Sequence, residues 1–157
     1  MTELYMEYGH GHWSQRCGSV FSILVGVMFL VAACGKLWDF ESFYQSLRGW
    51  AILRSETAAV ASIAVPLVEV AAGLGLVLWP RKLPAIVFGG VVLVVFTIAY
   101  IAQTVLYERP DCNCLGVLQN WLAVREHFSA IVLRNALLLS MIAVSGVFAW
   151  RAGGARE

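Results

Sequence analysis

The chain has 157 residues, of which 60% are hydrophobic and 13% are charged, and its formal net charge is +1. Because soluble domains carry about a quarter charged residues, this composition predicts an integral membrane protein in contact with lipid. The small net charge gives no attraction to polyanions, and the sequence contains no nucleotide-binding loop or hydrolase triad. Nucleic-acid binding and those enzyme classes are therefore excluded.

Four long charge-poor stretches divide the chain. We expect membrane-spanning helices at about 18–37, 57–79, 84–107 and 129–150. Each is long enough, since a helix needs roughly 20 apolar residues to cross a bilayer. Strands of a membrane barrel would instead appear as segments of about ten residues with alternating hydrophobicity, and the sequence lacks that alternation. The prediction is an all-α, integral membrane four-helix bundle that forms a single domain over residues 1–157.

Small residues recur at four-residue spacing in the first two predicted spans. Gly18, Ser22 and Gly26 share one face of the first, and Ala71 and Gly75 share one face of the second. Small side chains let helix backbones approach closely in lipid. We expect these positions to pack helices rather than to carry chemistry, and we expect residues 1–16 to form a short terminal tail.

The two longer connecting segments, 38–56 and 108–127, are predicted to contain amphipathic helices. In the first, Phe40, Phe43 and Leu47 recur at helical spacing with polar residues between them, as in a helix that lies at a membrane interface. In the second, Leu118, Leu122 and Arg125 repeat that spacing. Together the two helices would form a lid over the mouth of the bundle; interfacial packing without any catalytic purpose is the alternative.

Four spans place both ends of the chain and the turn at 81–82 on one side, and the two longer segments on the other. Basic residues are equally frequent on the two sides. Arg81, Lys82 and Arg151 directly flank spans, however, and such residues weigh most in setting orientation. We therefore expect a multi-pass membrane protein with both termini cytoplasmic and the two segments extracytoplasmic.

The closely spaced cysteines Cys112 and Cys114 are the candidate catalytic residues. A disulfide between cysteines two positions apart is strained, and strained disulfides are readily exchanged. Metal capture by the two thiols and two inert cysteines are the alternatives. Cys34 emerges on the same side as this pair, either as a resolving thiol or as a small apolar residue. Cys17 lies 17 residues from Cys34 on one helix, about 26 Å away, which is too far for a disulfide.

Ionisable residues inside the predicted spans form a second candidate site. A charge near the bilayer centre costs at least about 2.5 kcal/mol, so Glu69 and Arg134 are expected to face the bundle interior and to pair with each other. Lys36 is the alternative partner of Glu69, and Asn135 is expected to add an interhelical hydrogen bond. The pair serves either as a clamp between helices or as part of a proton path or quinone pocket. No cofactor motif is evident, a quinone remains an open alternative, and no metal site is predicted.

Four short motifs give the chain a family resemblance. Residues about 18–150 resemble the methylamine-utilisation protein E (MauE) family of the wider DoxX-like membrane group. The motifs that carry the resemblance are Ala33-Cys34-Gly35-Lys36-Leu37, Pro66-Leu67-Val68-Glu69, Cys112-Asn113-Cys114-Leu115-Gly116 and Arg134-Asn135. The chain departs from the family pattern at Leu115, where an aromatic residue is usual, and at Cys34, where alanine or glycine is commoner.

The resemblance implies a protein of the bacterial inner (cytoplasmic) membrane. It also implies help in maturing a disulfide-rich periplasmic client, typically the small subunit of methylamine dehydrogenase, alongside a thioredoxin-like partner. The function predicted first is therefore an activity like that of a thiol-disulfide oxidoreductase. A complete relay from thiols to a quinone is not expected, because only Cys34 is left to form a second thiol pair. The alternatives are a non-enzymatic assembly or anchor subunit of a membrane complex and, third, a small transporter gated by Glu69.

Overall fold

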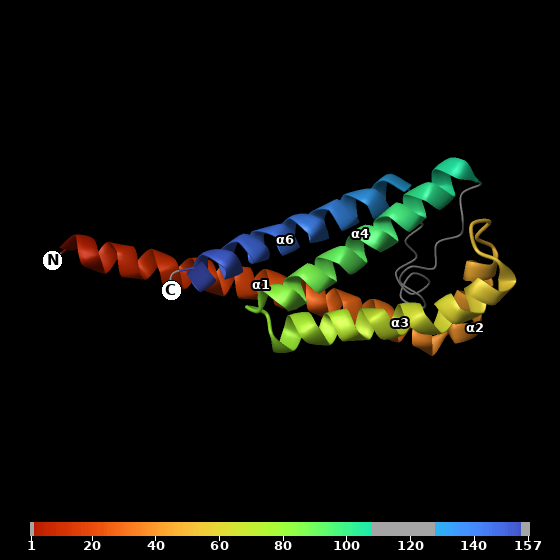
Figure 1. Cartoon of the computed structure of the whole chain (residues 1–157), viewed down its shortest axis with the longest axis horizontal. Coiled ribbons are helices and arrows are strands. Elements are labelled where there is room, and N and C mark those ends of the chain that lie inside the picture. The colour runs from red at the N-terminus through yellow and green to blue at the C-terminus, as the bar shows by residue number, and fades with distance from the viewer. Residues whose placement is uncertain (1, 108–127, 155–157) are drawn as a thin grey trace.

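The structure, a computed structural model, describes residues 2–107 and 128–154. This part of the chain consists of helices joined by short turns, without strands, and the predicted all-α fold is confirmed (Figure 1). The helices are α1 (Thr2–Trp38), α2 (Phe40–Arg48), α3 (Ser55–Leu78), α4 (Leu83–Leu106) and α6 (Phe128–Gly154).

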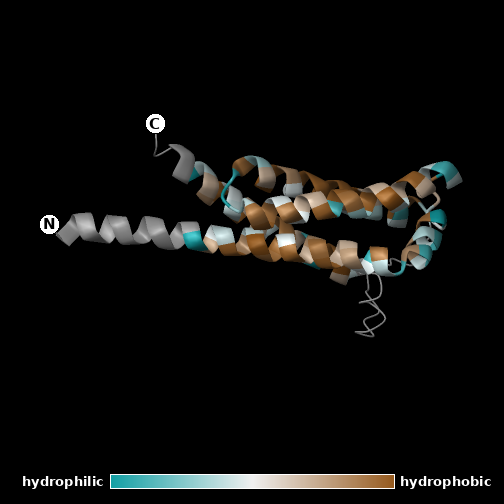
Figure 2. Ribbon diagram, turned by 90° about the horizontal axis from the view of Figure 1, so that it is seen from below, coloured by the Kyte–Doolittle hydropathy of each residue, from teal (hydrophilic) through white to brown (hydrophobic). Residues whose placement is uncertain are grey.

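Four of these helices are long and apolar enough to cross a membrane. The candidate spans are Arg16–Trp38, Ser55–Leu78, Leu83–Leu106 and Ser129–Arg151. Hydrophobic residues run along most of their length (Figure 2). Large apolar side chains point outward as well as inward, and Val60 and Ile98 are 69% and 61% exposed. A continuous apolar outer surface of this kind requires a lipid environment rather than water.

The four long helices form a closed ring around a shared core. α1 packs against α3 and α6, and α4 packs against both of the same helices. Val25, Leu76, Leu93 and Ile142 come from the four different helices and meet in the core. Both ends of the chain lie at one end of the bundle, and α2 lies at the other (Figure 1).

Glycines set the closest approach in this ring, between α1 and α3. A Cβ atom added to Gly26 would lie 2.9 Å from the carbonyl oxygen of Gly73, and one added to Gly73 would lie 2.9 Å from that of Gly26. Gly26 was predicted to allow close packing, and it does so against Gly73. Ala71 and Gly75, the small residues singled out on the second span, do not lie at this crossing. Ala71 is exposed, and a Cβ added to Gly75 would meet Ala85 of α4 at 3.7 Å.

The first predicted amphipathic helix is present as α2. Asp39 caps its start, since its carboxylate accepts a hydrogen bond from the backbone N–H of Ser42 at 3.2 Å. Phe43 and Leu47 are buried against Ala58 of α3, so α2 packs along the first turns of α3. The second predicted amphipathic helix falls in segment 108–127, which lies outside the described residues.

The predicted terminal tail is part of α1. This helix begins at Thr2 and runs without interruption into the membrane span. Residues 2–16 contain no proline, and extending an existing helix by one residue adds a hydrogen bond without the cost of starting a new helix. Propagation from the long apolar segment therefore accounts for the difference.

Candidate functional site

A buried salt bridge between Lys36 of α1 and Glu69 of α3 lies inside the bundle. The Lys36 ammonium donates hydrogen bonds to both carboxylate oxygens of Glu69, with Nζ to oxygen distances of 2.7 and 2.8 Å. Each side chain is only 6% exposed. The ammonium also lies 5.7 Å from the ring centroid of Phe43, within the range of a cation–π interaction.

The partner predicted first for Glu69, Arg134, is wrong. Glu69 pairs with Lys36, the alternative partner, in place of Arg134. Lys36 lies two residues before the end of α1, whereas Glu69 lies 14 residues, about 21 Å, after the start of α3. The contact therefore requires α1 to end before it reaches the level at which α3 begins. The crossing of Gly26 and Gly73 agrees, because α1 ends 12 residues after Gly26 whereas α3 begins 18 residues before Gly73. Counting residues gives a position along one helix but not the depth of that helix relative to its neighbour.

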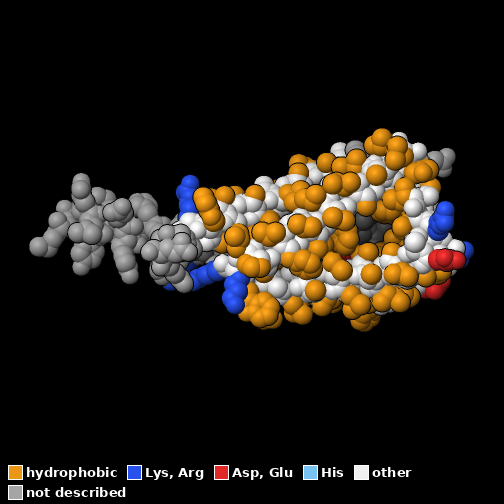
Figure 3. All heavy atoms as spheres, viewed as in Figure 1, with side chains coloured by type: hydrophobic (Ala, Val, Ile, Leu, Met, Phe, Trp, Pro, Cys, Tyr) orange, Lys and Arg blue, Asp and Glu red, His pale blue; other side chains and the backbone are white. Residues whose placement is uncertain are grey.

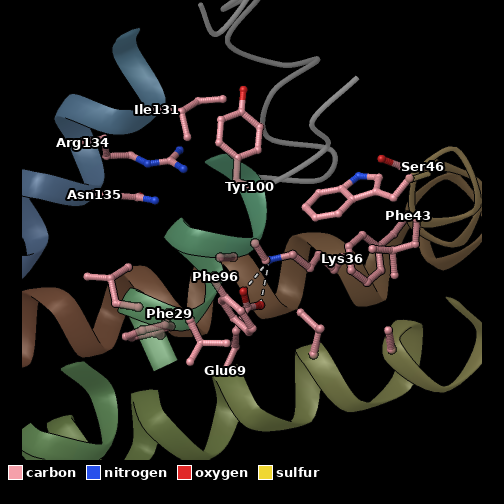
Figure 4. A pocket seen from close by; sticks show the side chains of 18 of the residues that line it. Phe29, Lys36, Phe43, Ser46, Glu69, Phe96, Tyr100, Ile131, Arg134 and Asn135 are labelled. Carbon is pink, nitrogen blue, oxygen red and sulfur yellow. Dashed lines mark hydrogen bonds and ion pairs between the residues drawn. The ribbon is translucent and has the colours of Figure 1, made fainter. Parts of the chain in front are cut away.

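This salt bridge lines a cavity of about 310 Å³. Its walls are mostly apolar, with aromatic rings from Phe29, Phe43, Phe96 and Tyr100. Arg134 and Asn135 point into it from α6, opposite the salt bridge (Figure 4). The structure thus brings together the four predicted intramembrane polar residues, which are Lys36, Glu69, Arg134 and Asn135.

Asn135 also joins α6 to α4. Its side-chain amide donates a hydrogen bond to the Thr97 hydroxyl at 3.0 Å, and that hydroxyl donates to the carbonyl oxygen of Leu93 at 2.7 Å. The interhelical hydrogen bond predicted for Asn135 therefore runs to Thr97. Because both side chains are at least partly buried, the bond fixes one wall of the cavity.

Polar residues of α4 near this cavity were missed from the sequence. Gln103 is only 2% exposed, and its side-chain oxygen accepts a hydrogen bond at 3.3 Å from the backbone N–H of Ile52, in the segment that follows α2. Thr97, Tyr100 and Gln103 recur every three residues along a mostly apolar helix. This polar stripe is the signal that would have identified α4 as a wall of the site.

The structure describes two of the four cysteines. Cys17 and Cys34 are free thiols, and both are exposed. Cys34 lies on the outer surface of α1, while its neighbours Ala33 and Lys36 face the interior. This position favours the interpretation of Cys34 as a small apolar residue over that of a resolving thiol. Cys112 and Cys114 lie outside the described residues.

The sequence matches a known family model over nearly the whole bundle. The model for "Methylamine utilisation protein MauE" matches residues 14–150. The chain belongs to the MauE family. No solved structure matches it.

Two relatives support the MauE assignment. A "Methylamine utilization protein MauE" of Paracoccus denitrificans is 34% identical over 125 residues, which cover 76% of this chain and 62% of that protein. A protein of the same name from Paracoccus versutus is 30% identical over 130 residues, which cover 83% of this chain and 65% of that protein. The chain thus spans less than two thirds of the length of either relative.

Proposed function

We propose that this MauE-family protein supports disulfide formation in a periplasmic client, such as the small subunit of an amine dehydrogenase, together with a thioredoxin-like partner. The observation that carries the proposal is the match of residues 14–150 to the family, because this range includes both Cys112 and Cys114. The relatives' names connect those proteins to methylamine utilisation, which supports a client from amine oxidation.

The chemistry of the proposal is thiol-disulfide exchange. A thiolate of the client attacks the Cys112–Cys114 disulfide and forms a mixed disulfide, and the second client thiolate then displaces this protein. The client loses two electrons and two protons, and Cys112 and Cys114 become thiols. The disulfide form of the thioredoxin-like partner restores the pair by the same exchange in reverse.

We place the protein in the bacterial inner membrane, with both termini cytoplasmic. Four basic residues lie at the end of the bundle that carries the termini: Arg16, Arg81, Lys82 and Arg151. Arg81, Lys82 and Arg151 directly flank spans at that end, whereas the acidic side chains on the face shown in Figure 3 gather at the α2 end. Lysine and arginine directly beside a span weigh most in keeping a segment in the cytoplasm, so these residues support the orientation. The segment that carries Cys112 and Cys114 then joins α4 to α6 on the periplasmic side.

Replacing both candidate thiols tests this function. In a strain that carries Cys112→Ser and Cys114→Ser, the client is expected to accumulate with free thiols while the amount of the membrane protein stays unchanged. The client's redox state is read from the mass added by a thiol-alkylating reagent. The matched control is Cys17→Ser with Cys34→Ser, which also removes two thiols and is expected to leave client oxidation intact.

Normal client disulfides in the Cys112→Ser and Cys114→Ser strain would overturn the exchange mechanism. If the client were then lost only on deletion of the whole protein, the chain would act as an assembly or anchor subunit.

A further inference from the structure

The cavity around Lys36 and Glu69 opens sideways, between α3 and α4. Ala61 and Val65 of α3 line it on one side, and Val95 and Ala99 of α4 line it on the other. Val95 is 54% exposed although it lines the cavity, so the cavity reaches the outer surface of the bundle. Figure 3 shows this face hollowed between the two helices, near the end that carries α2.

The apolar surroundings of this opening restrict the ligands that can enter the cavity. The outer surfaces of α3 and α4 are apolar, with exposed side chains such as Ile63, Leu67 and Ile98. In a bilayer the opening faces hydrocarbon, so an entering ligand must be soluble in lipid. Glu69 lies about 21 Å along α3 from Ser55 and about 14 Å from Leu78, well inside the span. A charged lipid head would be costly to bring to that depth, whereas an uncharged head is tolerated.

The interior selects for a flat ring that accepts hydrogen bonds. The rings of Phe29, Phe43 and Phe96 line the cavity, and aromatic side chains stack on flat ligands. The Lys36 ammonium has three N–H donors, and it donates hydrogen bonds to both carboxylate oxygens of Glu69. Arg134 also points into the cavity, so N–H groups of two cationic side chains lie along its described walls.

We propose that this cavity binds the head of a membrane quinone, with the isoprenoid tail leaving between α3 and α4. The two carbonyl oxygens of a quinone accept hydrogen bonds, its ring is flat and uncharged, and its tail is soluble in lipid. A volume of about 310 Å³ lies at the lower end of the range for small-molecule sites, which suits the head but not the whole molecule. The inference concerns binding alone and does not depend on the thiol chemistry proposed above.

Titration with decylubiquinone tests this site, using the full chain in lipid nanodiscs. Trp50 lines the cavity, so bound quinone is expected to quench tryptophan fluorescence, and Trp50→Phe is expected to remove the saturable part of that quenching. Ala99→Phe fills the opening and is expected to weaken binding at least about tenfold. The control is Ile98→Phe, one residue along the same helix, whose side chain is exposed and does not line the cavity.

The same preparations give a second, independent measurement. Lipid extracts of the purified protein are expected to contain native quinone in stoichiometric amount, and the Ala99→Phe variant is expected to lose it. Equal quenching by Ala99→Phe and Ile98→Phe would show that the quinone only partitions into the bilayer and would overturn the proposal. A fatty acid or phospholipid that co-purifies in place of the quinone would overturn it as well.

Discussion

Replacing Glu69 with leucine is expected to lower the free energy of unfolding by about 3–5 kcal/mol, since it leaves the Lys36 ammonium buried without its counter-charge. Replacing both residues, Lys36→Met with Glu69→Leu, is expected to recover most of that loss, because two apolar side chains need no partner. Unfolding by denaturant in detergent micelles measures both variants.

The control for this experiment is Glu56→Leu, which removes a carboxylate from the same helix at an exposed position. Its effect on stability is expected to stay within about 0.5 kcal/mol. If Glu69→Leu were no more destabilising than Glu56→Leu, the salt bridge would not hold α1 against α3. If the double variant Lys36→Met with Glu69→Leu were as unstable as Glu69→Leu alone, the unpaired Lys36 charge would not be the cause of the lost stability.

Replacing Gly73 with valine is expected to push α1 away from α3. Its Cβ atom would lie 2.9 Å from the carbonyl oxygen of Gly26 and 2.8 Å from a carbon atom of the Leu30 side chain, so the backbone of one helix has to move. Overpacking of this kind costs about 1–3 kcal/mol, and it shifts the helix that carries Lys36. Thermal unfolding of the purified protein measures the loss.

Gly75→Val is the matched control, two residues along the same helix. A Cβ atom there would meet the Cβ of Ala85 at 3.7 Å, an ordinary contact distance. The Gly75 variant is expected to unfold close to the temperature of the unsubstituted protein and the Gly73 variant several degrees lower. Equal unfolding temperatures would mean that α1 and α3 do not cross at Gly26 and Gly73.

Local features of the fold were predictable because they depend on nearby residues. The lengths of the charge-poor runs predicted the spanning helices, and the spacing of Phe40, Phe43 and Leu47 predicted α2. The high cost of a charge in lipid correctly predicted that Glu69 would be buried and paired. These conclusions need only helix geometry and transfer energies, both of which can be read from one sequence.

The relative depth of the helices could not be predicted in the same way. The choice between Arg134 and Lys36 as the partner of Glu69 depends on where α1 ends relative to α3. That level depends on contacts between the two helices, such as the crossing of Gly26 and Gly73. The contact of Gly73 with α1 could not be predicted either, because it depends on the rotation of α3 about its own axis. Rotation and depth are properties of packing between helices, so short spacing patterns do not determine them.

The cavity adds a second role for residues that were predicted to be a clamp. Lys36 and Glu69 hold α1 to α3, and they also line a space that opens toward lipid. Stability alone does not explain a buried ion pair at these positions, since apolar replacements of buried ion pairs are often as stable. The salt bridge is therefore best tested for both stability and ligand binding in the same variants.

Labelling with a membrane-impermeant maleimide tests the central claim, that the Cys112 and Cys114 thiols face the periplasm while both termini are cytoplasmic. Two variants are compared in spheroplasts treated with a mild reductant, one retaining Cys114 and the other retaining Cys17 as its sole cysteine. The account predicts that Cys114 is labelled in intact spheroplasts and that Cys17 is labelled only after lysis. Labelling of Cys17 in intact spheroplasts, with Cys114 protected until lysis, would contradict it.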